Sequence, residues 1–150
     1  MIKYNYGVLS SSVIIDQRTG QLSLINIIDQ VTVESLPTGI PNVSFATFWS
    51  RTENIDKDET YTGRLARSPE VSSEIRDLDK PEFDIRFDKG SKEARVILGF
   101  GGILISNEGE NFFNFEIKDR DQWTHSGGIK LEVNKAPDPS SVSESPALQE

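Results

Sequence analysis

Short runs in which apolar and polar residues alternate are the feature of this sequence that most constrains its fold. The clearest run is Phe113–Lys118, and the same period of two recurs in Ile129–Val133, Phe83–Phe87 and Val43–Trp49. In a β-strand this alternation places apolar side chains on one face and polar side chains on the other. The pattern is typical of antiparallel sheets that have one buried face and one solvated face.

Residues that favour tight turns lie between these runs. Asp16–Gly20, Asp88–Gly90 and Ser126–Gly128 each contain glycine, which tolerates the backbone conformations that short connections need. Pro37–Pro41 is expected to form a crossover, since proline cannot donate a hydrogen bond to a central strand pair. We therefore predict an all-β protein, an antiparallel β-sandwich (Ig-like or similar) of about eight short strands.

Helix signals are weak along the whole chain. In the segment Ser68–Leu78, Ser68 could cap a helix and Pro69 suits the first helical position. We expect at most one short helix near residues 68–78.

The segment Leu22–Val33 does not follow a simple alternation, because apolar residues occupy both parities. The interpretation that we favour is a central strand with a bulge near Asn26 that changes the register. The alternative is that a partner, such as a second subunit, covers the other face. A second irregular segment, Gly99–Gly102, is interpreted as a bend or bulge between strands at 94–98 and 103–105.

Length and charge divide the chain into two parts. The 150 residues suffice for one domain, which we place at residues 1–134. Residues 135–150 contain three of the seven prolines and no aromatic residue, and we expect them to form a disordered acidic tail. Of the formal net charge of −8, the tail carries −2 and the folded part −6.

Composition narrows the function classes. The chain has no cysteine and one histidine, which removes disulfides, thiolate metal sites and cysteine nucleophiles. Neither a signal-peptide pattern nor a run of roughly 20 apolar residues is present, so we expect a cytoplasmic protein without a membrane partner. The acidic balance argues against nucleic-acid binding, which requires clustered lysine and arginine.

Several segments together are similar to a known family. They resemble a bacterial family of small proteins of unknown function, which typically has an aromatic first strand, a D-x-x-G-x-L-x-L-x-x-I-x-D segment, an L-P loop and a C-terminal G-x-x-F/Y-x-F-x-I/V hairpin. The resemblance implies a β-sandwich and supplies no catalytic residues. The matching segments are Tyr6–Leu9, Asp16–Asp29, Leu36–Pro37 with Pro41, Trp49–Arg51 and Leu104–Ile117.

No motif in the sequence specifies a reaction. His125 is interpreted as an exposed residue of a hairpin turn, and the acidic cluster at Asp77–Asp84 lacks the glycine of a calcium loop. Gly99–Gly102 lacks the lysine of a phosphate-binding loop, and Ser10–Ser12 lacks a nucleophile elbow. We therefore predict no catalytic, cofactor-binding or metal-binding residue, no cofactor, and a protein that is not an enzyme.

The remaining interpretation is a noncatalytic protein-interaction or structural module. Its partner would be another protein, such as the product of a neighbouring gene in an operon, or a second copy of the chain. The alternatives are a small-ligand-binding β-sandwich and a hydrolase that uses paired carboxylates. The candidate partner-binding residues are two aromatic anchors and three basic side chains, namely Phe48, Trp123, Lys89, Lys92 and Arg95.

Overall fold

The computed structural model describes residues 1–68 and 80–137, and this part of the chain is all-β. It contains no helix long and apolar enough to cross a membrane. The helix expected near residues 68–78 falls almost entirely outside the described residues. Of the tail expected at residues 135–150, the part after Pro137 is also outside them, while Lys135 is the last residue of the final strand. The strands are β1 (Ile2–Ile15), β2 (Leu22–Ile27), β3 (Gln30–Val33), β4 (Thr38–Arg51), β5 (Glu59–Ser68), β6 (Glu82–Phe87), β7 (Glu93–Ile105), β8 (Gly109–Asp119) and β9 (Gln122–Lys135).

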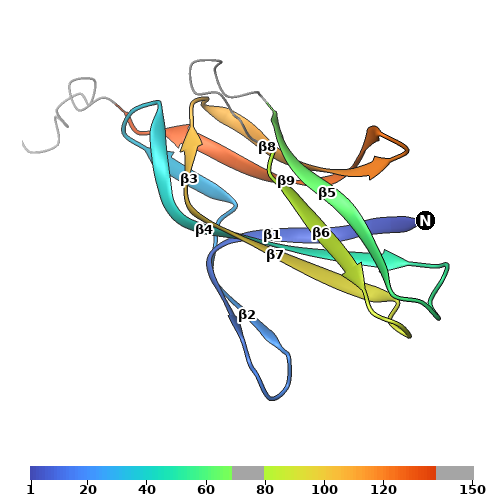
Figure 1. The fold of residues 1–150 in the computed structure, drawn as a ribbon. Helices are drawn as coiled ribbons and strands as arrows, with labels where there is room; N and C mark the ends of the chain where they lie inside the picture. The colour runs from blue at the N-terminus through green and yellow to red at the C-terminus, as the bar shows by residue number, and fades with distance from the viewer. Residues whose placement is uncertain (69–79, 138–150) are drawn as a thin grey trace, which may run out of the picture.

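The strands form two sheets that pack face to face, which confirms the predicted sandwich (Figure 1). The four-stranded sheet has the order β2-β1-β4-β7, and the five-stranded sheet has the order β3-β9-β8-β5-β6. Each pair of neighbouring strands is antiparallel except β3 and β9, which are parallel. The described part therefore has nine strands instead of about eight.

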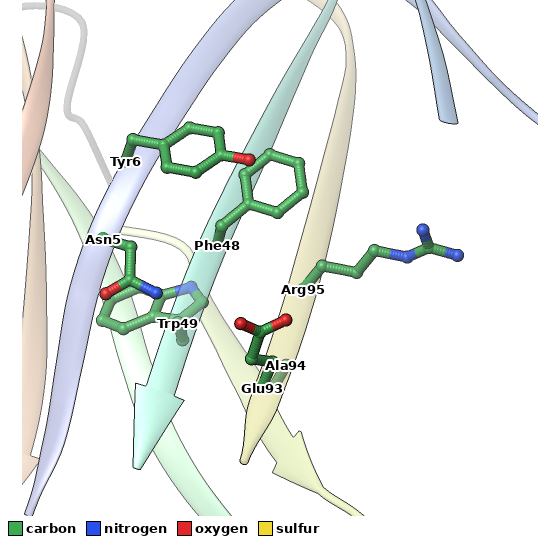
Figure 2. Close-up of a pocket in the computed structure, with 7 residues that line it drawn as sticks. All are labelled: Asn5, Tyr6, Phe48, Trp49, Glu93, Ala94 and Arg95. Carbon is green, nitrogen blue, oxygen red and sulfur yellow. The ribbon is translucent and has the colours of Figure 1, made fainter. Parts of the chain in front are cut away.

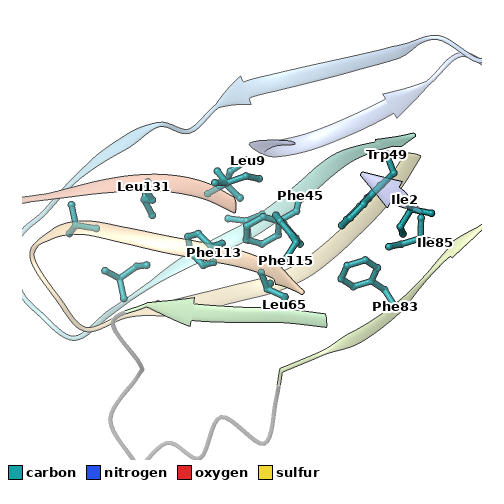
Figure 3. Packing of buried hydrophobic residues seen from close by; sticks show 14 of the residues in the cluster. Ile2, Leu9, Phe45, Trp49, Leu65, Phe83, Ile85, Phe113, Phe115 and Leu131 are labelled. Carbon is teal, nitrogen blue, oxygen red and sulfur yellow. The ribbon is translucent and has the colours of Figure 1, made fainter. Parts of the chain in front are cut away.

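The core lies between the two sheets and is built from the residues that the alternation selected (Figure 3). Phe113 and Phe115 of β8 are buried, and Phe45 of β4 meets them from the opposite sheet, with ring centroids 4.9 Å and 6.3 Å away. Trp49 lies with its ring centroid 6.4 Å from that of Phe115. Burial of these aromatic and aliphatic side chains supplies the main stabilisation of the fold.

Gly127 and Gly128 lie inside β9, so the predicted turn at Ser126–Gly128 is wrong. The chain instead turns between β8 and β9 at Arg120 and Asp121, whose φ angles are 49° and 65°. Gly127 is required for a different reason, since a Cβ at this position would collide with the ring of Tyr4. His125 consequently lies in strand β9 opposite Glu116, and is not a turn residue.

The segment Leu22–Val33 is two strands in different sheets, so the prediction of one central strand is wrong. β2 is an edge strand of the four-stranded sheet, and β3 is an edge strand of the five-stranded sheet. The backbone of Asn26 has a φ of 54°, but the pairing of β2 with β1 keeps one register. Apolar residues of both parities occur within β2 itself, where Leu22 and Leu24 alternate with Ile25 and Ile27, and the chain then changes sheets at Ile28 and Asp29.

Two further expectations concern the far end of β4 and β7. Thr38–Pro41 belongs to β4 instead of a crossover, and Pro41 lies where β1 no longer pairs with β4. β7 is one continuous strand through Gly99–Gly102, so the predicted division into two strands is wrong. The paired residues Val43 and Phe100, and Ile40 and Ile103, all contact the core, although an odd number of positions separates them. In place of the predicted bend, both strands change the face that they turn towards the core, while the pairing of β4 with β7 continues.

Arg51, at the end of β4, forms hydrogen bonds with two of the connections between strands. Its side chain is fully buried. Nε donates a hydrogen bond to the carbonyl of Ser91 at 2.9 Å, and Nη2 donates to the carbonyls of Asp88 at 2.9 Å and Ile55 at 3.3 Å. Because these carbonyls lie in the β4–β5 and β6–β7 connections, one guanidinium group holds both in place.

The charge of Arg51 is balanced on β5. Its Nη1 lies 3.8 Å from Oε2 of Glu59, and the Tyr61 hydroxyl donates to the same oxygen at 2.5 Å. Burial, together with the Glu59 carboxylate, raises the pKa of Tyr61 to about 12. The arginine, carboxylate and phenol form one connected polar group at this end of the sandwich.

Candidate protein-binding surface

The side of the four-stranded sheet that points away from the core carries apolar rows between polar ones. On β4, Phe45 and Trp49 are buried in the core, so the alternate positions face outwards. The strand register aligns two rows of outward side chains across β1, β4 and β7, and we call these rows the outer face. The rows are Tyr6, Phe48 and Arg95, followed by Val8, Ala46 and Ile97, and of these Ala46 is fully buried beneath its neighbours.

Two stacked aromatic rings form one end of the outer face (Figure 2). The rings of Tyr6 and Phe48 have centroids 4.4 Å apart and an interplanar angle of 21°. Tyr6 is 57% exposed, and Phe48 is half-buried beneath it. An open depression of about 330 Å³ lies beside them and is also lined by Asn5, Glu93 and Arg95. The stack thus presents a flat apolar surface with polar groups at its border.

Strands β1 and β2 form a hairpin that begins within the four-stranded sheet and extends beyond it. We use "the hairpin" for residues 10–27. Figure 1 shows that it extends away from the two sheets at the bottom of the view. Its isoleucines are the most exposed aliphatic residues of the described chain apart from Met1. Their exposed fractions are 52% for Ile14, 48% for Ile15, 40% for Ile25 and 62% for Ile27.

Both faces of the hairpin are apolar. Residues that pair across the two strands point to the same face, and Ile14 pairs with Ser23, Ile25 with Ser12 and Ile27 with Ser10. In this register the three isoleucines lie on one face of the hairpin. The opposite face carries two apolar pairs across the strands, Val13 with Leu24 and Ile15 with Leu22. A solvated surface hairpin normally has one polar face, so the apolar character of both faces distinguishes this hairpin from the rest of the surface.

Hydrogen bonds hold the turn of the hairpin, and the Arg95 side chain of β7 lies close to it. Asp16 accepts a hydrogen bond from the Arg18 amide at 2.8 Å through its Oδ1, and its carbonyl accepts one from the Gly20 amide at 2.7 Å. Gly20 has a φ of 71°, a left-handed conformation that glycine adopts without strain. A Cβ at Gly20 would lie 4.0 Å from Nη2 of Arg95. The turn and the outer face therefore approach each other at Arg95.

The free edges of the two sheets differ in charge. β6, at one edge of the five-stranded sheet, exposes Glu82, Asp84 and Arg86, and β3 at the other edge has only four residues. Charged side chains and short strands are usual protections against pairing with another chain. β2 has no charged residue, and β7 has none between Val96 and Ile105. The edges of the four-stranded sheet therefore lack this protection.

The aromatic residue predicted on the other sheet, Trp123, is half-buried and engaged within the protein. The guanidinium carbon of Arg64 lies 4.3 Å from its ring centroid, and Nζ of Lys118 lies 6.0 Å away. Arg64 also binds Oε2 of Glu116 at 2.6 Å. The interactions of Trp123 are therefore those of a residue packed under its neighbours.

The five predicted partner-binding residues do not form one site. Phe48 and Arg95 are cross-strand neighbours on the outer face. Lys89 and Lys92 are exposed in the connection between β6 and β7, where the Lys89 amide donates to Oδ1 of Asp58 at 2.6 Å. With Trp123 on the other sheet, only two of the five belong to the surface described above.

Sequence reasoning did not select Tyr6 or the exposed isoleucines of the hairpin. The signal was present in Leu22–Val33, where apolar residues of both parities suggested cover on two faces. That signal mixed two strands, and only the β2 part belongs to the hairpin. The position of Tyr6 on the outer face follows from an irregularity in the β1–β4 register between Tyr4 and Tyr6, which alternation cannot predict.

A metal site requires several ligating side chains close together. Within residues 1–68 and 80–137, no group of three or more histidine, aspartate or glutamate side chains could hold a metal ion. No family model and no curated protein sequence matches the chain.

Proposed function

We propose that this protein is a noncatalytic protein-binding module that contacts its partner through the outer face and the hairpin of the four-stranded sheet. One observation carries the proposal: four isoleucines at 40% to 62% exposure lie on a hairpin that is apolar on both faces. Large apolar side chains gathered at one exposed place are typical of protein interfaces. The stacked Tyr6 and Phe48 extend this surface with aromatic area, which often dominates binding energy.

Capture of proteins from a native lysate by the immobilised full chain tests the proposal. The wild-type protein is expected to retain a specific protein, identified by mass spectrometry, which Ile27→Lys loses. Phe112→Lys is the matched control, because Phe112 is a 37% exposed apolar residue on the other sheet and the charge change is the same. Retention that Ile27→Lys leaves unchanged, or no specific retention of either another protein or a second copy of the chain, would overturn the proposal.

A second candidate function is binding of a small molecule beside the aromatic stack. The observation that favours it is the depression in Figure 2, where Asn5, Glu93 and Arg95 surround the rings of Tyr6 and Phe48. A ligand with a flat apolar face and polar substituents fits this arrangement. In a thermal-shift screen, a ligand at a hundredfold excess over its Kd would stabilise the protein by about 2.7 kcal/mol. Tyr6→Ala should remove the shift, and a screen without shifts would exclude this candidate.

A further inference from the structure

We infer that the partner of the hairpin is a second copy of this chain, and that two copies associate edge to edge through β2. The inference rests on the proposed function and adds the identity of the partner. In the resulting dimer, the two hairpins would form one four-stranded antiparallel sheet between the two sandwiches.

The first support is the composition of the hairpin. Where it leaves the sandwich it is a two-stranded ribbon, and such ribbons are marginally stable in water without further strands or packing. Ile15 and Ile27 lie on opposite faces and remain 48% and 62% exposed. Joining two hairpins gives four strands and lets the apolar side chains of each ribbon contact those of the other.

The second support is the free edge of β2. Among the described strands, β2 pairs with β1 alone, so one side of its backbone has free hydrogen-bonding groups. Leu22–Ile27 contains neither a charged residue nor a proline that would oppose strand addition. An antiparallel contact of an edge with its own copy has two-fold symmetry, which is the commonest symmetry of soluble oligomers.

The third support is charge. The whole chain carries −8, but the hairpin contains only Asp16 and Arg18, which balance each other. Two copies that approached through other parts would bring net negative charge together, whereas the hairpins meet as neutral surfaces. A strongly acidic or basic partner would find no compensating charge there, so the neutral hairpin of a second copy is the better match.

The segment that follows Pro137 does not have the composition to cover the hairpin from within the same chain. Residues 138–150 contain Val142, Ala147 and Leu148 among serines, prolines and acidic residues. Three small or medium apolar side chains cannot match the set exposed on the two faces of the hairpin. A second copy, in contrast, brings an identical hairpin with the same apolar side chains.

Analytical ultracentrifugation of the purified full chain over a range of concentrations tests the inference. The wild type is expected to reach twice the chain mass of 16.8 kDa. Ile27→Lys removes apolar contact, and Ser23→Lys adds a charge to the edge without removing an apolar side chain. Each should raise the dimer dissociation constant by more than about tenfold. Phe112→Lys should leave it unchanged, and circular dichroism verifies that all variants are folded.

The outcomes separate the two proposals. A wild-type protein that stays monomeric at high concentration overturns the dimer, and the proposed function then stands only if a different protein is captured through Ile27. Monomeric protein without capture that depends on Ile27 overturns both. Assembly that neither Ile27→Lys nor Ser23→Lys weakens also overturns the dimer through β2, since it would place the contact at another edge such as β7.

Discussion

Both sheets of this sandwich contribute to the core, but they have very different outer surfaces. The five-stranded sheet covers its outer side with charged and polar groups, such as the ion pair of Arg64 and Glu116 against Trp123. The four-stranded sheet exposes stacked aromatic rings and the isoleucines of its hairpin. Because both sheets bury the same kind of residue inside, the two sides of the molecule differ mainly in their outer surfaces, and this difference is the basis of the proposed binding side.

The same contrast extends to the edges. The five-stranded sheet ends in a charged strand, β6, and a very short strand, β3. The four-stranded sheet ends in β2 and in a long uncharged stretch of β7. A soluble chain with unprotected edges risks aggregation unless those edges are used. The difference favours the four-stranded sheet as the side on which sheet extension and apolar contact would occur together.

The largest expected effect is on the core that the two sheets share. Phe115→Asp places an unpaired charge between Phe45, Trp49 and Tyr4, and should lower the free energy of unfolding by more than about 4 kcal/mol. Urea denaturation followed by tryptophan fluorescence measures the change. A loss below about 1 kcal/mol would show that β8 does not present Phe115 to the four-stranded sheet.

The next largest effect is expected at Arg51. Arg51→Met keeps the volume but leaves the carbonyls of Ser91, Asp88 and Ile55 without their donor, at a cost of about 3 kcal/mol. The control is Arg86→Met, because Arg86 is exposed and its ion pair with Asp88 contributes little. Chemical denaturation of both variants checks the difference. Equal losses would contradict the anchoring role of Arg51.

A smaller effect is expected on the outer side of the five-stranded sheet. Glu116→Lys breaks the pair with Arg64 and places two cations together, and should cost about 1 kcal/mol. Residual exposure of both side chains allows part of this cost to be relieved by solvent. Thermal unfolding at low and high salt measures it, and the cost should fall as salt screens the repulsion. A cost that does not depend on salt would mean that lost packing on Trp123 dominates.

The smallest effect is absent at neutral pH and develops only in alkali. Burial raises the pKa of Tyr4 on β1 and of Tyr61 on β5 to about 12, from the ordinary value of 10.0. The folded state therefore holds these protons more tightly than the unfolded state, so stability should be lost as the pH rises from 10 to 12. Tyr4→Phe and Tyr61→Phe should each flatten this loss in pH-dependent denaturation. Variants with the wild-type alkaline profile would contradict the assignment.

The sequence predicts the inner faces of the strands well and the connections poorly. Alternation identifies Phe113, Phe115 and Leu131 as core residues, because the face on which a side chain lies is set by its position within its own strand. Gly127 looked like a turn residue because its real constraint, the ring of Tyr4, lies more than a hundred residues away. The role of Arg51 likewise depends on the β6–β7 connection, where Asp88 and Ser91 lie 37 and 40 residues further along the chain. Long-range contacts of this kind leave no periodic signal.

The candidate surface was only partly predictable for the same reason. Phe48 and Arg95 could be selected as single residues, but their alignment with Tyr6 requires the strand order β1-β4-β7. The hairpin isoleucines could be recognised as excess apolar residues in Leu22–Val33. Their exposure became evident only when β2 and β3 were separated into two sheets.

Hydrogen–deuterium exchange of the full chain at low and high protein concentration tests the central claim most directly. The amides of β2 and β6 are compared in the same sample, because both are edge strands of about equal length in different sheets. If the four-stranded sheet is the binding side, exchange in β2 should slow as concentration rises, while exchange in β6 stays constant. Exchange in β2 that does not change with concentration, or slowing in β6 instead, would contradict the account.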